Sequence, residues 1–207
     1  SSFNQDIGNW DVSSGTDFNG MFSGASSFNQ DIGNWDVSNG TNFKYMFFRA
    51  GAFNQDIGSW NVSNGTDFSW MFAGSWDVPS NFNSDISNWD VSNGTDFEHM
   101  FTFAVAFEQY ISNWQVSDSA LLTNMFFDAD LMLSNLGFSS SPTSAEFNRT
   151  IFTDRNSLDT AITAWIEDEA AATATYGDIN TWDVRAITDF SNLFQNKATF
   201  NSDISNW

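Results

Sequence analysis

Hydrophobic positions recur along the chain at a nearly constant interval. Phe-Asn pairs begin at Phe3, Phe28, Phe53 and Phe82, and a degenerate copy begins at Phe107, which gives intervals of 25, 25, 29 and 25 residues. A tryptophan follows each of these phenylalanines after seven residues. Five copies in one register identify a tandem repeat. The longer interval contains four extra residues, which we interpret as a loop inserted between two repeats.

Two hydrophobic patterns alternate within each repeat. In the first repeat, the apolar positions of residues 6–12 suit a short bent strand. Residues 18–25 place apolar side chains at i, i+3, i+4 and i+7, which is typical of one or two helical turns. A strand followed by a short helix in one repeat is the plan of leucine-rich repeats. The pattern therefore predicts an α/β repeat solenoid with a parallel sheet and an aromatic core, with an all-β solenoid as the alternative.

The repeat pattern also predicts the organisation of the chain. Residues 1–137 hold five coils and a degenerate sixth, and residues 138–153, with a serine run and Pro142, read as a loop or linker. Residues 154–177 have the periodicity of an amphipathic helix that opens a second array. Residues 178–207 form this second array, which is incomplete.

The composition narrows the possible partners. The chain has 26 acidic and 6 basic residues and a formal charge of -20, so nucleic acids and anionic membrane surfaces would be repelled. The 23 phenylalanines and 10 tryptophans argue against disorder, because disordered chains are poor in aromatic residues. There is no cysteine for disulfides or thiolate metal sites, and no apolar run long enough to predict membrane insertion of this segment.

The residues FNQDIGNWDVS and the following MF-GA resemble the BspA-like surface-protein repeat, a leucine-rich-repeat relative found in bacterial lipoproteins and surface proteins and in algal secreted proteins. The segment around residues 152–184 looks like the helix that opens such a domain. One departure is systematic, because four copies have glycine where the family usually has valine: Gly15, Gly40, Gly65 and Gly94. The resemblance implies a surface module without catalytic activity and an extracellular or cell-surface location.

Two functions are therefore expected. The first is a structural or adhesive scaffold whose partners are surface proteins, glycans or other copies of the chain; because neither end has a capping sequence, the scaffold would assemble end to end into a fibre. The alternative is a recognition module for a glycan or protein ligand, with Trp70 and Trp76 as the binding residues because both lie outside the repeat register. An enzyme is not expected: the single histidine, His99, has no equivalent in the other repeats and reads as a surface variation.

Stacking would turn equivalent aspartates into rows, which raises a metal hypothesis. Ca²⁺ is bound by several oxygen ligands, so the rows are candidate calcium sites, and no other cofactor is expected. The other interpretation is that each carboxylate accepts backbone N–H groups within its own turn. The rows are Asp6, Asp31, Asp56 and Asp85, and Asp11, Asp36 and Asp90.

Five asparagines begin N-x-S/T sequons and are candidate glycosylation sites: Asn39, Asn61, Asn64, Asn93 and Asn148. Sequons also arise by chance in a chain rich in asparagine, serine and threonine.

Overall fold

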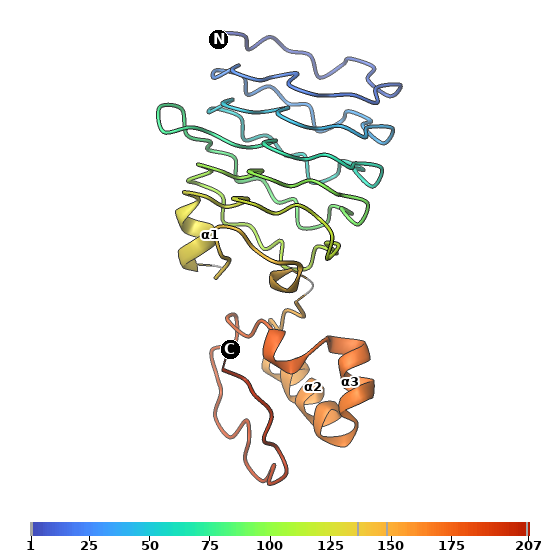
Figure 1. The fold of residues 1–207 in the computed structure, drawn as a ribbon, viewed down its shortest axis with the longest axis vertical. Helices are drawn as coiled ribbons and strands as arrows, with labels where there is room; N and C mark the ends of the chain where they lie inside the picture. The colour runs from blue at the N-terminus through green and yellow to red at the C-terminus, as the bar shows by residue number, and fades with distance from the viewer. Residues whose placement is uncertain (1, 136, 148, 206) are drawn as a thin grey trace. The chain divides into compact units, whose positions relative to one another are not determined.

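The structure is a computed structural model that describes residues 2–135, 137–147, 149–205 and 207, and the chain folds into two compact units, Ser1–Phe147 and Asn148–Trp207. In the first unit, successive repeats are coils that lie one upon the next, as the blue to yellow ribbon in Figure 1 shows. Helix α1, Asp130–Asn135, and the 3₁₀ helix η1, Ser144–Glu146, follow the last coil. The predicted linker does not lie wholly outside this unit, since Phe138 and Phe147 are buried in its core.

The predicted parallel sheet is wrong, and so is the all-β alternative. Among the described residues, neighbouring coils share only isolated parallel bridges, at Asp17, Asn42, Asp67, Asp96 and Leu121. The reason is that each coil turns every few residues. In the first coil the N–H of Trp10 donates to the carbonyl of Ile7, and the N–H of Gly15 donates to that of Val12. No stretch stays extended long enough to form a ladder with the next coil.

The predicted helical turn is also absent from the repeats. In the first coil the N–H groups of Met21, Ser23 and Ala25 close tight turns onto the carbonyls three residues earlier. The intervening N–H groups, starting with Phe18 and Gly20, donate instead to carbonyls of the next coil at 2.7–2.8 Å. This series of turns puts residues four positions apart, such as Gly20 and Gly24, in the left-handed region, which an α-helix does not allow. The turns still bring the helix-spaced apolar residues to one side, which is why the sequence pattern is misleading.

Side chains also join neighbouring coils, through hydrogen bonds that recur from one repeat to the next. The indole N–H of Trp35 donates to the carbonyl of Ile7 at 3.1 Å, and Trp60, Trp89 and Trp114 repeat this bond. The side-chain oxygen of Asn4 accepts the N–H of Asn29 in the next coil. The same bond recurs in the following coils, so the otherwise unpaired backbone groups gain partners.

The core of the first unit is a set of stacked aromatic columns, which confirms the predicted aromatic core. Phe72 is fully buried, and its ring centroid lies 3.9 Å from that of Phe82, the phenylalanine that begins the next repeat. It also stacks on Phe47 and Phe101, which occupy the equivalent position in the neighbouring coils. The tryptophans form a second column in which neighbouring rings are 6.5 Å apart and nearly parallel. A repeat of identical rings therefore fills the interior by packing each residue on its own copies.

The second unit begins with helices rather than coils. The stretch predicted as one helix forms two, α2 (Arg155–Glu167) and α3 (Glu169–Tyr176), which meet at Asp168. Asp168 caps α3 by accepting the N–H of Ala171, so the same residue ends one helix and starts the next. A further 3₁₀ helix, η2 (Ile179–Thr181), follows.

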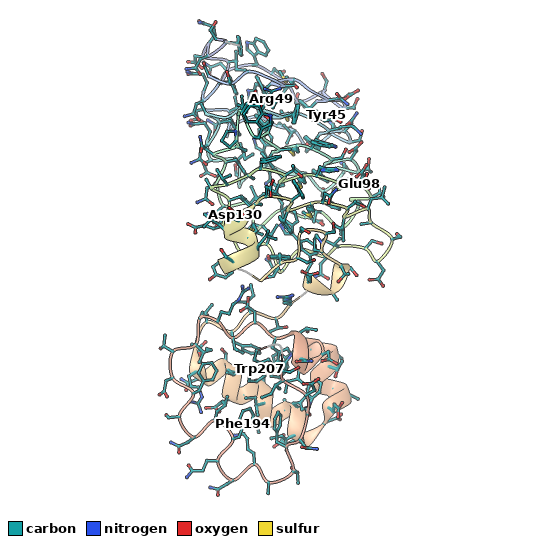
Figure 2. All side chains as sticks on the ribbon, turned by 60° about the vertical axis from the view of Figure 1, so that its left-hand side comes forward. Tyr45, Arg49, Glu98, Asp130, Phe194 and Trp207 are labelled. Carbon is teal, nitrogen blue, oxygen red and sulfur yellow. The ribbon has the colours of Figure 1, made fainter. Side chains whose placement is uncertain are left out.

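A coil with the geometry of the first unit closes the second one. The indole N–H of Trp207 donates to the carbonyl of Ile179, at the same sequence separation of 28 as the bond from Trp35 to Ile7. Phe194 and Trp207, labelled in Figure 2, pack at 6.2 Å between ring centroids.

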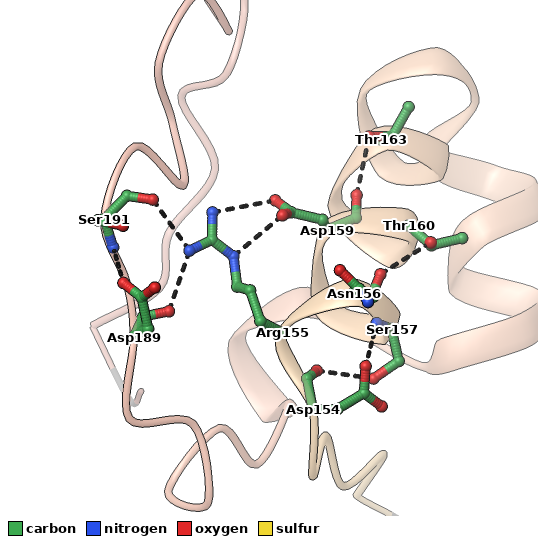
Figure 3. A network of polar contacts seen from close by, with 9 residues as sticks. All are labelled: Asp154, Arg155, Asn156, Ser157, Asp159, Thr160, Thr163, Asp189 and Ser191. Carbon is green, nitrogen blue, oxygen red and sulfur yellow. Dashed lines mark hydrogen bonds and ion pairs between the residues drawn. The ribbon is translucent and has the colours of Figure 1, made fainter.

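Arg155 ties this coil to helix α2, as Figure 3 shows. Its guanidinium forms an ion pair with Asp159 and donates from Nη1 to the carbonyls of Asp189 and Ser191.

Candidate functional site

The inserted loop is a rigid turn that projects one tryptophan. The backbone groups of Ser75 and Val78 are hydrogen-bonded to each other in both directions. The carboxylate of Asp77 accepts the hydroxyl of Ser75 at 2.8 Å and pairs with Arg49 of the preceding coil at 2.6 Å. Hydrogen bonding from Ser75, with a smaller contribution from Arg49, holds the pKa of Asp77 below its ordinary value. At the tip of this pinned turn, Trp76 is 84% exposed.

A surface pocket of about 390 Å³ lies against this loop. Its wall is mostly aromatic, with a few polar groups. The lining residues are Phe48, Trp70, Gly74, Ser75, Trp76, His99, Thr102, Phe103, Asn124 and Phe127. The structure thus brings Trp70 and Trp76 to one pocket.

These two tryptophans have different roles in the pocket. Trp70 lies in a column of rings between Tyr45 at 5.8 Å and His99 at 4.0 Å, and both of its faces are covered. The edge of Phe48 also contacts it. Trp70 is therefore a wall of the pocket, whereas the ring of Trp76 is free to accept a ligand.

Several residues of the pocket wall have a left-handed backbone conformation. Trp70, His99, Phe103 and Asn124 all line the pocket and have φ between 53° and 60°. The first coil has Gly20 and Gly24 at the corresponding positions, so the fold itself needs no side chain there. A non-glycine residue in this region costs about 1–2 kcal/mol. The same conformation occurs at Tyr45, Arg49 and Asp128, which do not line the pocket, so it belongs to the repeat. The pocket is the candidate site because its mostly aromatic wall lies beside the exposed ring of Trp76.

Sequence reasoning missed most of this wall. His99 looks isolated in the sequence, and Phe103, Asn124 and Phe127 fall within ordinary repeat positions. One signal was available, because the position occupied by Gly20 becomes Tyr45, Trp70, His99 and Asn124 in later repeats. Such variation at one position of an otherwise regular repeat is what a binding surface requires.

The acidic rows have local partners. In the first row, the carboxylates of Asp6, Asp31 and Asp56 accept the N–H of the glycine two residues later at 2.9–3.0 Å, and Asp85 accepts that of Ser87 at 2.9 Å. In the second, Asp11, Asp36 and Asp90 accept serine N–H groups in the same way at 3.0–3.1 Å. Within the described part of the chain, no group of three or more Asp, Glu, His or Cys side chains is placed to hold a metal. The calcium hypothesis gains no support from this geometry.

Acid is expected to destabilise the first unit, even though protonation would relieve the repulsion between neighbouring carboxylates of the rows. Hydrogen bonds from serine hydroxyl and N–H groups lower the pKa of Asp11, Asp36, Asp85 and Asp90. A pKa lowered by folding stabilises the fold above the unfolded value of 3.8, and this contribution is lost as the pH falls through the lower folded value. Burial raises the pKa of Asp96, which acts in the opposite direction at one site. The melting temperature should fall as the pH drops below about 3.8, and less steeply when Ser13, Ser38 and Ser92 are replaced by alanine. A melting temperature that rises on acidification would show instead that repulsion dominates the rows.

The sequon asparagines take part in contacts between coils and within turns. The side-chain nitrogens of Asn39, Asn64 and Asn93 donate to carbonyls of the preceding coil at 2.8 Å. Asn61 accepts the N–H and hydroxyl groups of Ser63. Asn148 lies outside the described residues. In the folded protein the nitrogen that would bear a glycan is thus already used at three sequons.

Over the described residues, no helix combines the length and apolarity needed to cross a bilayer. No curated protein and no solved structure matches the chain. One family model, described as a Mycoplasma protein of unknown function, DUF285, matches three successive segments, residues 1–80, 75–165 and 166–207. Because these successive matches together cover the length of the chain, the chain belongs to the DUF285 repeat family.

Proposed function

We propose that the chain is a non-enzymatic recognition module that binds neutral saccharides in the pocket beside the inserted loop. The observation that carries the proposal is Trp76, an almost fully exposed indole on a turn pinned by hydrogen bonds and an ion pair. A turn that is already held in one conformation loses little backbone entropy when its side chain binds a ligand.

The chemistry of the pocket favours a sugar. Sugar rings present C–H groups on one face, and these pack on the electron-rich face of an indole such as Trp76. The edges of a sugar carry hydroxyls, which can meet the polar groups of His99 and Asn124 on the same wall. A formal charge of -20 disfavours anionic polysaccharides, so the proposed ligand is neutral.

Binding without hydrolysis is proposed because the pocket lining contains no aspartate or glutamate. Glycoside hydrolysis generally uses a pair of carboxyl groups on either side of the scissile bond. The resemblance of FNQDIGNWDVS to BspA-like repeats supports an extracellular or cell-surface location for this module. Adhesion through surface glycans would be its role there.

Replacing Trp76 with alanine is expected to abolish saccharide binding and leave the melting temperature unchanged, because the side chain is exposed. Binding is measured by isothermal titration calorimetry with the hexasaccharides of cellulose, laminarin, mannan and xylan, and with oligogalacturonate as the acidic comparison. The matched control is Trp10→Ala, which removes an indole that is also exposed but does not line the pocket. Absence of binding to all four neutral hexasaccharides, or equal affinity of the Trp76 variant, contradicts the proposal. Binding of a protein rather than a saccharide would instead support a module that recognises a protein ligand.

A further inference from the structure

The hydrogen bonds around His99 determine which of its ring nitrogens carries the proton. The hydroxyl of Thr102 has a single proton, and it donates to the carbonyl of Asn124 at 2.9 Å. A carbonyl cannot donate, so this bond has only one direction. Nδ1 of His99 lies 3.1 Å from the same hydroxyl oxygen. Since the Thr102 proton is already used, Nδ1 must be the donor, and the neutral ring has its proton on Nδ1.

The other ring nitrogen, Nε2, is consequently an acceptor that the protein does not use. No hydrogen bond to it is found among the described residues, and it is not among their buried unsatisfied atoms, so it contacts solvent. Trp70 stacks on the imidazole at 4.0 Å and 17°, which fixes the plane of the ring. The bond to Thr102 fixes its rotation within that plane. The lone pair of Nε2 is therefore held in one direction at the wall of the pocket.

The surroundings keep this ring neutral near neutral pH. Burial lowers the pKa of His99, and the nearby carboxylates of Glu98 and Asp96 oppose this effect to a smaller extent. None of the other residues that line the pocket has a side chain that ionises near neutral pH. Nε2 thus remains available as an acceptor under the conditions in which the pocket would bind a ligand.

We propose that His99 determines specificity in this pocket by accepting, at Nε2, a hydrogen bond from a hydroxyl group of the saccharide stacked on Trp76. The inference rests on the proposed function. Asn124 lines the same pocket, and its side-chain amide supplies both a donor and an acceptor for the ligand. Together these groups can bond to the hydroxyl groups of a saccharide. Thr102 is a positioning residue, because it acts only through the tautomer and rotation of His99.

The protein offers a direct spectroscopic test, because His99 is its single histidine and gives the only imidazole signals. Nitrogen-15 NMR of the free protein is expected to show a protonated Nδ1 and an unprotonated Nε2. Addition of the hexasaccharide that binds best should then lower the pKa of His99. The reason is linkage: a ligand that donates to Nε2 binds the neutral ring better than the protonated ring. A proton on Nε2 in the free protein overturns the inference, as does a pKa that rises or stays constant on binding.

Two variants separate this role from general packing. His99→Phe keeps an aromatic ring in the stack but removes the acceptor, and Phe103, also at positive φ, shows that phenylalanine is tolerated in that backbone conformation. Its affinity should fall about 2- to 10-fold, the value of one hydrogen bond. Thr102→Val should weaken binding in the same direction while leaving the histidine in place. The matched control is Tyr45→Phe, which removes a hydroxyl from the same ring column outside the pocket.

The outcomes distinguish the two proposals. If the wild-type protein binds none of the neutral hexasaccharides, the proposed function itself fails. If the wild-type protein binds and His99→Phe binds equally well, the function stands and the role of His99 is overturned.

Discussion

Replacing Trp60 with alanine should lower the free energy of unfolding of the first unit by about 3–5 kcal/mol. Trp60 is 4% exposed and lies between Trp35 and Trp89, each 6.5 Å away between ring centroids. Its indole N–H also donates to the carbonyl of Ile32. The variant would lose packing on both faces of the ring, leave a cavity in the tryptophan column and remove one of the two hydrogen bonds that the Ile32 carbonyl accepts, the other coming from the N–H of Trp35. Urea unfolding followed by circular dichroism measures the change.

The same substitution at the first coil provides the control. Trp10 occupies the equivalent repeat position, but it is 55% exposed, and among the described rings it stacks only on Trp35. Trp10→Ala should therefore cost far less, since much of the ring already contacts water. Equal losses for the two variants would show that stacking within the column does not stabilise this unit.

Replacing Gly58 with alanine should destabilise the first unit by about 1–3 kcal/mol, because it overpacks the contact between two coils. A Cβ atom at this position would lie 2.4 Å from the backbone oxygen of Asp85 in the next coil. To relieve this contact, one coil must shift against the other, and the shift would disturb the hydrogen bonds between the two coils. Thermal unfolding of the variant measures the loss.

A paired substitution at the equivalent position has the opposite expected sign. Ser112 takes the place of Gly58 in the repeat that begins at Phe107, and its hydroxyl is buried without a hydrogen-bond partner among the described residues. Ser112→Ala should raise stability by about 1 kcal/mol, because it removes an unsatisfied polar group. Two variants that place alanine at the same repeat position thus differ in direction. A loss of stability in Ser112→Ala would mean that this hydroxyl has a partner.

The candidate site was accessible to sequence reasoning only in part. Trp70 and Trp76 stood out because they break the repeat register. His99, Phe103 and Phe127 did not, because their association depends on which side of each coil a residue faces. That direction follows from the left-handed conformation of Trp70, His99 and Phe103, and a sequence pattern that suggests helical turns hides it.

The sequence by itself determined the repeat, its register and the composition of the core. Identical residues at a fixed interval, such as Phe28, Phe53 and Phe82, can bury themselves only by packing on their own copies, so the stacked aromatic columns follow from periodicity alone. The tertiary structure decided the conformation of the backbone within each coil. Local patterns predicted a strand and a helix, yet alternate N–H groups bond to the neighbouring coil, starting with Phe18 and Gly20, while the others close tight turns. The partners that decide between helix, strand and turn lie about one repeat away in the chain, so no pattern within a single repeat could reveal them.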